Sequence, residues 1–238
     1  SVNLLKDIQK MSIPLTTLSL FLTDALILQT CLTIPTLISL FTSVPSFLGK
    51  RTWADISQYQ WSLPALRDLS LVEHKHRSSW YSSDVWPTHP FYIELLKRHL
   101  LNLQSLLMHP MTTHVYDPMS PLCWTKMPNL QVLATEFGNR PAAFLSRLHF
   151  LPISRSGSVR HLIQFGQFPV GNRAETGLCR YIPMCTRLES VTIVDYDVGK
   201  WTSVETSKEM AKFRDICRGR GITVWAQRDV HFPRQLVP

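Results

Sequence analysis

The sequence predicts an α/β fold in which short parallel strands and helices alternate as a right-handed solenoid, with the parallel sheet on its concave face. Three observations lead to this prediction. A leucine frame of the form L-x-x-L-x-L recurs along the chain, its copies are similarly spaced, and several intervening segments carry apolar residues at helical spacing. A strand that returns at a fixed distance after a helix is most simply placed in a parallel sheet with right-handed crossovers.

The frame is clearest in LPALRDLSLVEH, residues 63–74, where Leu66, Leu69 and Leu71 occupy its three apolar positions. Leu69 and Leu71 lie on one side of a strand, because successive side chains alternate between its two faces. Five clear copies of the frame begin at Leu66, Leu103, Leu130, Val159 and Leu188. The first step between these starts is the longest. The other three lie at or near the upper end of the roughly 20–29 residues of leucine-rich repeats.

Weaker copies extend the pattern in both directions, with IPLTTLSLF and IPTLISLF upstream and GITVW downstream. Their frame residues are Leu15, Leu18 and Leu20, then Leu37 and Leu40, and finally Ile222 and Val224, which follow Val191 and Ile193 after a step of similar length. No Gly/Ser linker or run of charge divides the chain. We therefore expect one irregular domain over residues 1–238, with the clearest repeats in 63–225 and the weakest in 1–62.

Two segments between strands have simple helical signals. THPFYIELLKRHLLNL, which enters a helix after Pro90, carries Ile93, Leu96, Leu100 and Leu101 at helical spacing. RPAAFLSRLHFL has a proline where the first turn of a helix tolerates one. Both segments fill gaps between copies of the frame, as a βα repeat requires.

The segment SVETSKEMAKFRDICRGRG gives the strongest helix signal. Thr206 and Glu209 resemble a capping box, and Gly219 or Gly221 can end the helix. A single apolar stripe is formed by Met210, Phe213, Ile216 and Cys217. The helix then leads directly into the ITVW strand.

This pattern of leucines, helices and strands resembles the degenerate leucine-rich repeats of fungal F-box proteins. The likeness rests on LPALRDLSL, MPNLQVLAT and CTRLESVTI, followed by FRDICRGRGITV, and it covers residues 63–224. Regular members carry an asparagine ladder at the third place after the last leucine, where this chain has His74, Met111, Gly138, Gln167 and Tyr196. The resemblance therefore implies irregular turns. No F-box helix cluster is recognisable, so we expect an adaptor-binding part to precede Ser1 or to be absent.

Composition bounds the class of protein. A chain of 238 residues with 45% hydrophobic content can bury a sizeable core. The net charge of +8 is uneven, with 10 Lys and Arg against 9 Asp and Glu in residues 1–138, and 15 against 8 in residues 139–238. The basic half suits an acidic partner or forms a solvated basic surface.

The cysteines indicate a reducing compartment. They are odd in number and unevenly spaced, at Cys31, Cys123, Cys179, Cys185 and Cys217. The spacing of Cys179 and Cys185 in LCRYIPMC fits no common zinc site, so buried apolar thiols are expected. Without a signal peptide, the protein is expected in the cytoplasm or nucleus.

One apolar stretch tests for a membrane span. ALILQTCLTIPTLISLFTS, residues 25–43, contains no charged side chain. Its length is close to the roughly 20 residues that a membrane helix needs. It also holds Gln29, Pro35 and four threonines, and prolines flank it at Pro14 and Pro45. This composition favours buried strands and turns over a membrane helix.

Catalytic and metal sites were sought in the polar segment EHKHRSSWYSSDVWPTHPFY. It brings together Glu73, His74, His76, Asp84 and His89, and His109 and His114 follow. No H-E-x-x-H, no G-x-S-x-G and no phosphate-cradling glycine loop accompanies them. We therefore predict no catalytic residue, no cofactor and no metal, and a metal-dependent enzyme is the weakest alternative.

Partner binding is predicted on two surfaces. Residues that flank the second leucine of each frame point to the concave face, namely Asp68 and Ser70, Ser105 and Leu107, Val132 and Ala134, His161 and Ile163, and Ser190 and Thr192. His109, Glu136, Phe165, Thr223 and Trp225 extend these rows. The second surface consists of the insertions 73–90 and 109–126, whose aromatic residues include Trp80 and Trp86.

The sequence thus predicts a protein–protein interaction module rather than an enzyme. The family resemblance implies the substrate-recognition part of an F-box-type ubiquitin-ligase receptor, reaching a cullin-ligase adaptor through a region outside this chain. The alternative is a binder of nucleic acid or another acidic surface through the basic C-terminal half. Sequence-specific nucleic-acid binding is not expected, because Trp201 and Trp225 lie too far apart to form a stacking platform.

Overall fold

The structure is a computed structural model, and it describes residues 7–8, 10, 14–21, 31–45, 60–74, 95–96, 98–109, 127–135, 158–165, 182, 185–195 and 208–228. Within this part the chain is α/β, and its strands pair in parallel. The predicted fold class is confirmed at this level. The chain divides into two compact units, residues 1–129 and 130–238, which are described in turn. One continuous domain stays a prediction.

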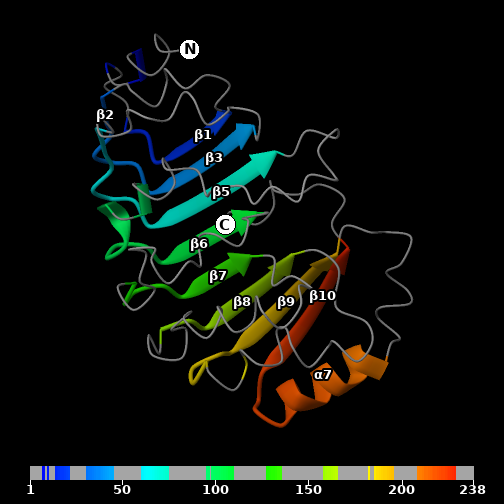
Figure 1. Cartoon of the computed structure of the whole chain (residues 1–238). Coiled ribbons are helices and arrows are strands. Elements are labelled where there is room, and N and C mark those ends of the chain that lie inside the picture. Colours follow the sequence, from blue (N-terminus) through cyan, green and yellow to red (C-terminus); the bar gives the residue numbers. More distant parts are fainter. Residues whose placement is uncertain are drawn as a thin grey trace, which may run out of the picture. The chain divides into compact units, whose positions relative to one another are not determined.

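The first unit contains four parallel strands in chain order (Figure 1). They are β1 (Thr17–Phe21), β3 (Ser39–Pro45), β5 (Asp68–His74) and β6 (Ser105–His109). Their register aligns Leu18, Leu40, Leu69 and Leu106 side by side. The two weak upstream copies of the frame are therefore confirmed as paired strands.

Two short strands of the first unit form a separate parallel pair. β2 (Leu32–Thr33) pairs with β4 (Trp61–Ser62), and each leads into the strand of its own repeat. The offset along the chain from Leu32 to Trp61 equals the offset from Leu40 to Leu69. The stretches 32–45 and 61–74 are therefore two copies of one structural repeat.

The second unit contains β7 (Val132–Thr135), β8 (His161–Phe165), β9 (Ser190–Asp195) and β10 (Thr223–Arg228), all parallel and in chain order, and helix α7 (Lys208–Arg218). The register aligns Leu133, Leu162, Val191 and Val224. The first two steps, from Leu133 to Leu162 and from Leu162 to Val191, have the equal length that the sequence predicted.

The predicted register of the last strand is wrong by two positions. The sequence frame placed Ile222 opposite Val191, whereas Val224 occupies that position. Ile222 is taken up by the end of α7, because its amide donates to the carbonyl of Cys217 at 2.9 Å. A shift of two positions preserves the face of every side chain, so Trp225 still lies on the predicted face.

One backbone contact recurs at nearly every step between repeats. The carbonyl of Ile38 accepts hydrogen bonds from the amides of both Arg67 and Asp68. The carbonyls of Thr16, Arg67, Gln131 and Arg160 each accept the two equivalent amides of the following repeat, at 2.8–3.1 Å. This contact fixes each new strand at the same height as the one before it.

Tight turns introduce several of these strands. The amide of Leu66 donates to the carbonyl of Leu63 at 3.0 Å, with Pro64 at the second position of the turn. Proline is favoured there because its fixed φ matches that position of a type I or II turn. Ile34–Leu37 and Cys185–Leu188 close in the same way. The first and last residues of these turns are buried, so the turns join the core.

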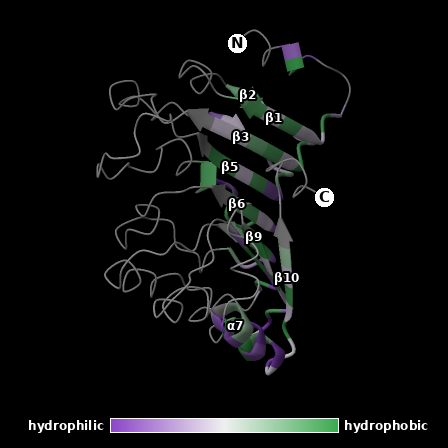
Figure 2. Ribbon diagram, turned by 90° about the vertical axis from the view of Figure 1, so that its right-hand side faces the viewer, coloured by the Kyte–Doolittle hydropathy of each residue, from purple (hydrophilic) through white to green (hydrophobic). Residues whose placement is uncertain are grey.

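The frame residues form the core. Figure 2 shows hydrophobic residues running along the strands. Exposure is 8% or less at Leu18, Leu20, Leu40, Leu69, Leu71, Leu106, Leu133, Leu162, Val191 and Ile193. Polar side chains replace leucine at Thr42, Thr135 and Gln164, and those of Thr42 and Gln164 are buried. The predicted inward face of the frame is confirmed.

Helix α7 confirms the strongest helix prediction. Met210, Phe213 and Cys217 form its buried stripe. Its end is a Schellman motif, in which the amide of Gly221 donates to the carbonyl of Arg218 at 3.0 Å. Gly221 has a φ of 70°, so it is the predicted glycine that ends the helix.

The other helix predictions are met in part. Residues 95–96 and 98–99 are helical, and Leu96 and Leu100 are buried as predicted. Leu101 is wrong as a core residue, because the chain turns at His99–Asn102 and leaves its side chain exposed. Ile93, Thr206 and the segment 140–151 lie outside the described residues. None of the helices in the described ranges has the length and hydropathy needed to span a bilayer.

Candidate partner-binding face

The candidate site is the face of the strands opposite the leucine core, which we call the non-core face. Its first row is the first residue of each strand, and its second row lies two positions further on. In the first unit these rows include Ser39, Asp68, Ser105, Ser70 and Leu107. In the second unit they include His161, Ser190, Thr223, Ile163, Thr192 and Trp225.

The non-core face of the first unit is polar at its first row, closed beyond that row on β5 and β6, and open on β1, where Ser19 is exposed and Phe21 is 64% exposed. Ser39 Oγ donates to Asp68 Oδ2 at 3.0 Å, which links β3 to β5. Asp68 is half-buried, whereas Ser70 is buried, as are Val72 and Leu107. Of the two predicted contact residues here, Asp68 therefore offers more surface than Ser70.

The non-core face of the second unit is open on β8, β9 and β10, whereas Ala134 on β7, a predicted contact residue, is buried. His161 Nδ1 lies 2.9 Å from Ser190 Oγ, the residue paired with it on β9. In the second row, Ile163 and Thr192 are half-buried, and Trp225 on β10 is 58% exposed. A large aromatic side chain with little rotational entropy is a strong candidate anchor for a partner.

Two charged residues border this first row. Arg160 Nη1 and Glu189 Oε1 form an ion pair of 2.7 Å, with both side chains about half exposed. His161 Nε2 lies 4.0 Å from the other oxygen of Glu189. Side-chain contacts thus connect the starts of β8 and β9, through Arg160, His161, Glu189 and Ser190.

A hydrogen-bonded serine and histidine can act as nucleophile and base, and such a site also needs a group that orients the base and donors that stabilise an oxyanion. The amides of Glu189 and Ser190 both donate to the carbonyl of Arg160, so neither is available to stabilise an oxyanion. The first unit places a second polar pair, Ser39 and Asp68, at the same row. The arrangement therefore acts as a link between adjacent strands.

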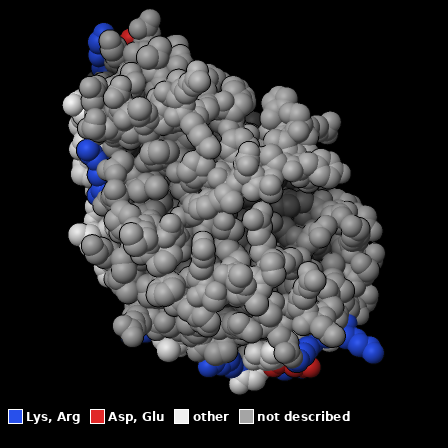
Figure 3. All heavy atoms as spheres, viewed as in Figure 1, with Lys and Arg blue, Asp and Glu red and all other residues white. Residues whose placement is uncertain are grey.

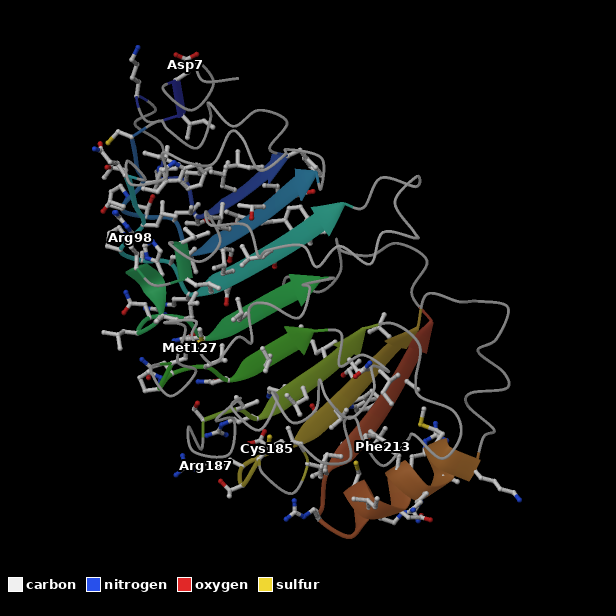
Figure 4. All side chains as sticks on the ribbon, viewed as in Figure 1. Asp7, Arg98, Met127, Cys185, Arg187 and Phe213 are labelled. Atoms are coloured by element: carbon white, nitrogen blue, oxygen red, sulfur yellow. The ribbon has the colours of Figure 1, made fainter. Side chains whose placement is uncertain are left out.

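Sequence reasoning missed two basic side chains, Arg187 in the turn before β9 and Arg220 in the turn before β10. Arg220 Nη1 donates to the carbonyl of Ile182 at 2.6 Å. Burial raises the pKa of the nearby Cys185 thiol to about 12, and the positive charge of Arg220 opposes that rise. Figure 4 shows Arg187 beside Cys185 on the turn before β9. Arg187 and Arg220 share one sequence signal, since each stands three places before the first strand residue, Ser190 or Thr223.

The corresponding positions of the first unit carry neutral donors. Asn102 Nδ2 donates to the carbonyl of Pro64 at 3.3 Å, and Asn129 Nδ2 donates to that of Leu101 at 2.8 Å. Thr36 Oγ1 bonds the carbonyl of Leu15 at 2.9 Å. The resemblance placed an asparagine ladder after the strands, whereas Asn102 and Asn129 make such bonds ahead of the strands. Their signal was an asparagine directly ahead of the first leucine of a frame.

The remaining predicted contact residues are less defined. His109 ends β6 and Phe165 ends β8, but their side chains are not among those described. Glu136, Trp80 and Trp86 lie outside the described residues, as does most of the histidine-rich insertion. The described ranges contain no cluster of three or more His, Cys, Asp or Glu that could hold a metal ion.

The buried thiols and a buried histidine have no place on the non-core face. Cys185 and Cys217 are buried as expected, whereas Cys31 is exposed, because it lies just ahead of β2. His99 is buried, and its Nε2 has no hydrogen-bond partner among the described residues. Burial and, to a smaller extent, the charge of Arg98 together lower the pKa of His99 to about 4.

Comparison with models of protein families, with characterised proteins and with solved structures finds no match to this chain.

Proposed function

We propose that the chain is a solenoid of leucine-rich-repeat type that recognises a protein partner through the non-core face of its second unit. One observation carries the proposal. Trp225 is exposed on β10. The residues beside it in the same row, Thr192 on β9 and Ile163 on β8, are half-buried, so a large aromatic side chain stands at the end of this row. Its position is fixed by six consecutive register pairs between β9 and β10.

The mechanism is display of side chains on a rigid frame. The backbone contact repeated between strands holds each row at one height, and the buried leucines hold the strands in place. A partner meeting this face finds side chains carried on a backbone that is already ordered, which lowers the entropic cost of binding. Most of the affinity is expected from a few anchors, with Trp225 first and His161 second.

The resemblance to fungal F-box proteins supports a more specific role, as the substrate-recognition part of a ubiquitin-ligase receptor. In that role the partner is a protein to be modified, and this chain makes and breaks no bond itself. Purification of the full-length parent, followed by mass spectrometry for a cullin-ligase adaptor, tests this role. Recovery of the parent without an adaptor would contradict it and leave the recognition function in place.

Selection of peptides displayed on phage against the immobilised chain tests the recognition function. We expect selected peptides to lose binding to Trp225→Ala and to keep binding to the matched control Phe21→Ala. Phe21 is the matched control because it is an exposed aromatic residue on the non-core face of the first unit, where it is 64% exposed on β1 and its ring centroid lies 5.9 Å from that of Phe41. Circular dichroism verifies that each variant is folded.

The insertions provide the competing surface. Trp80→Ala and Trp86→Ala are tested with the same selected peptides. Loss of binding in these two variants, with Trp225→Ala and His161→Ala unaffected, would overturn the assignment of the non-core face.

A further inference from the structure

Two arginines occupy equivalent positions in neighbouring repeats of the second unit. Arg187 stands three places before Ser190, and Arg220 stands three places before Thr223, which is the register partner of Ser190. Both belong to turns that lead directly into paired strands. Their backbones are therefore neighbours at the same end of the sheet.

The contacts of Arg220 bring its charge to the turn that holds Arg187. Its guanidinium donates to the carbonyl of Ile182 at 2.6 Å and lies close enough to Cys185 to affect the thiol pKa. The amide of Leu188 closes that turn on the carbonyl of Cys185. Arg187 lies within this turn and is exposed. A carbonyl partner leaves the full charge of Arg220 in place, so two positive charges gather here.

The carboxylates described nearby are already paired. Glu189 binds Arg160 at 2.7 Å, and Asp215 on α7 binds Arg218 at 2.8 Å. Figure 3 shows Lys and Arg side chains along the lower margin of the molecule, where Figure 1 places α7. Arg187 and Arg220, which we call the turn pair, stand three places before Ser190 and Thr223 in the first row of the non-core face.

We propose that Arg187 and Arg220 bind closely spaced carboxylates of an acidic protein segment that continues along the non-core face toward Trp225. Guanidinium groups match carboxylates in shape and form charge-assisted hydrogen bonds with them. This inference rests on the proposed function and adds the charge of the partner. A protein segment fits better than nucleic acid, because nucleic-acid binding draws on many phosphate contacts and on several stacked aromatic rings.

A defined probe tests the inference. A short fluorescein-labelled peptide with four consecutive glutamates is compared with its four-glutamine counterpart by fluorescence anisotropy. We expect the glutamate peptide to bind at least about tenfold more tightly, and Arg187→Gln to weaken it by about tenfold. The matched control is Arg218→Gln, which removes an exposed arginine already paired with Asp215 and is expected to change affinity less than about twofold.

Three results would overturn the inference. The first is equal binding of the two peptides, and the second is an equal loss of affinity in Arg187→Gln and Arg218→Gln. The third is tighter, Arg187-dependent binding of a short single-stranded oligonucleotide, which would assign the turn pair to nucleic acid. Arg220→Lys keeps the charge and loses the planar guanidinium, so it is expected to weaken binding less than Arg187→Gln does. If displayed peptides depend on Trp225 while the glutamate peptide does not bind, the inference fails and the proposed function stands. If no displayed peptide depends on Trp225, the proposed function fails.

Discussion

The two units stack their strands in the same way and connect them differently. In both, a carbonyl ahead of one strand accepts amides from the next repeat. The first unit adds neutral bonds from Asn102 and Asn129 to backbone carbonyls, whereas the second adds Arg160–Glu189 and the arginine pair of its turns. Backbone and leucines fix the repeat, so residues outside the frame are free to differ. That freedom gives the two units different polar contacts, and the turns of the second unit carry the arginine pair.

The shared leucine core gives the largest expected effect. Leu69 in the first unit and Leu133 in the second are each 1% exposed, so replacing either with Ala is expected to cost about 2–5 kcal/mol of unfolding free energy. Because contacts cluster within each unit, hydrogen exchange should rise mainly in the unit that carries the substitution. Ser62→Ala, an exposed position on β4, is the control. A loss below about 0.5 kcal/mol at either leucine would contradict the shared core.

The second largest expected effect is a loss of stability in acid, which comes from His99 in the first unit. Its pKa is about 4 in the folded chain against 6.5 for an unperturbed histidine, so unfolding takes up a proton between these values. The stabilisation is complete above about pH 6.5 and is lost as the pH falls to about 4, by roughly 3 kcal/mol at most. Denaturant unfolding at several pH values measures it. His99→Gln, which gains no proton there, should remove this component of the slope, and an unchanged slope would contradict the prediction.

The end of α7 tests a feature found in the second unit. Gly221 has a φ of 70°, where a side chain is strained even though a Cβ would meet no atom within 4 Å. Gly221→Ala is therefore expected to destabilise the chain by about 1–2 kcal/mol. Gly219→Ala is the matched control, because its Cβ would make only ordinary contacts and its φ is not positive. Equal losses in the two variants, measured by thermal unfolding, would argue against the cap.

Salt gives the smallest and most selective difference. Glu189→Gln removes the half-exposed ion pair with Arg160 and is expected to cost less than about 1 kcal/mol at low salt, falling toward zero at about 1 M NaCl. Asn129→Ala removes a neutral bond to Leu101 and is expected to cost about 0.5 kcal/mol at every salt concentration. Salt-dependent losses in both variants would contradict the view that neutral bonds link the repeats of the first unit and charged contacts link those of the second.

Sequence reasoning reached the strands through periodicity and failed where local geometry intervened. The leucine frame identified every strand that aligns in the leucine register of either unit, including the weak copies at Leu18 and Leu40, because burial on one face imposes alternation. It misplaced the register of β10, because the bond from Ile222 to Cys217 that ends α7 involves no side chain. It also counted Leu101 as core, since helical spacing does not show where a helix turns away.

In the candidate site too, the sequence predicted the face on which a residue lies but not the contacts that it makes. Alternation along a strand was enough to put His161 and Trp225 on the non-core face, opposite the leucines. Their different exposures and the bond from His161 to Ser190 depend on neighbouring strands that belong to other repeats of the chain. Propensity does not encode contacts over such a separation.

By itself, the sequence determined which strand residues face the core and that parallel strands recur along the chain, because both follow from a local pattern of apolar side chains. Only the tertiary structure decided which polar residues meet. Arg220 reaches Ile182, and Asn129 reaches Leu101, and in each case the two partners come from neighbouring repeats. Such contacts depend on how one repeat stacks on the next, and a side chain's own sequence neighbours carry no information about that stacking.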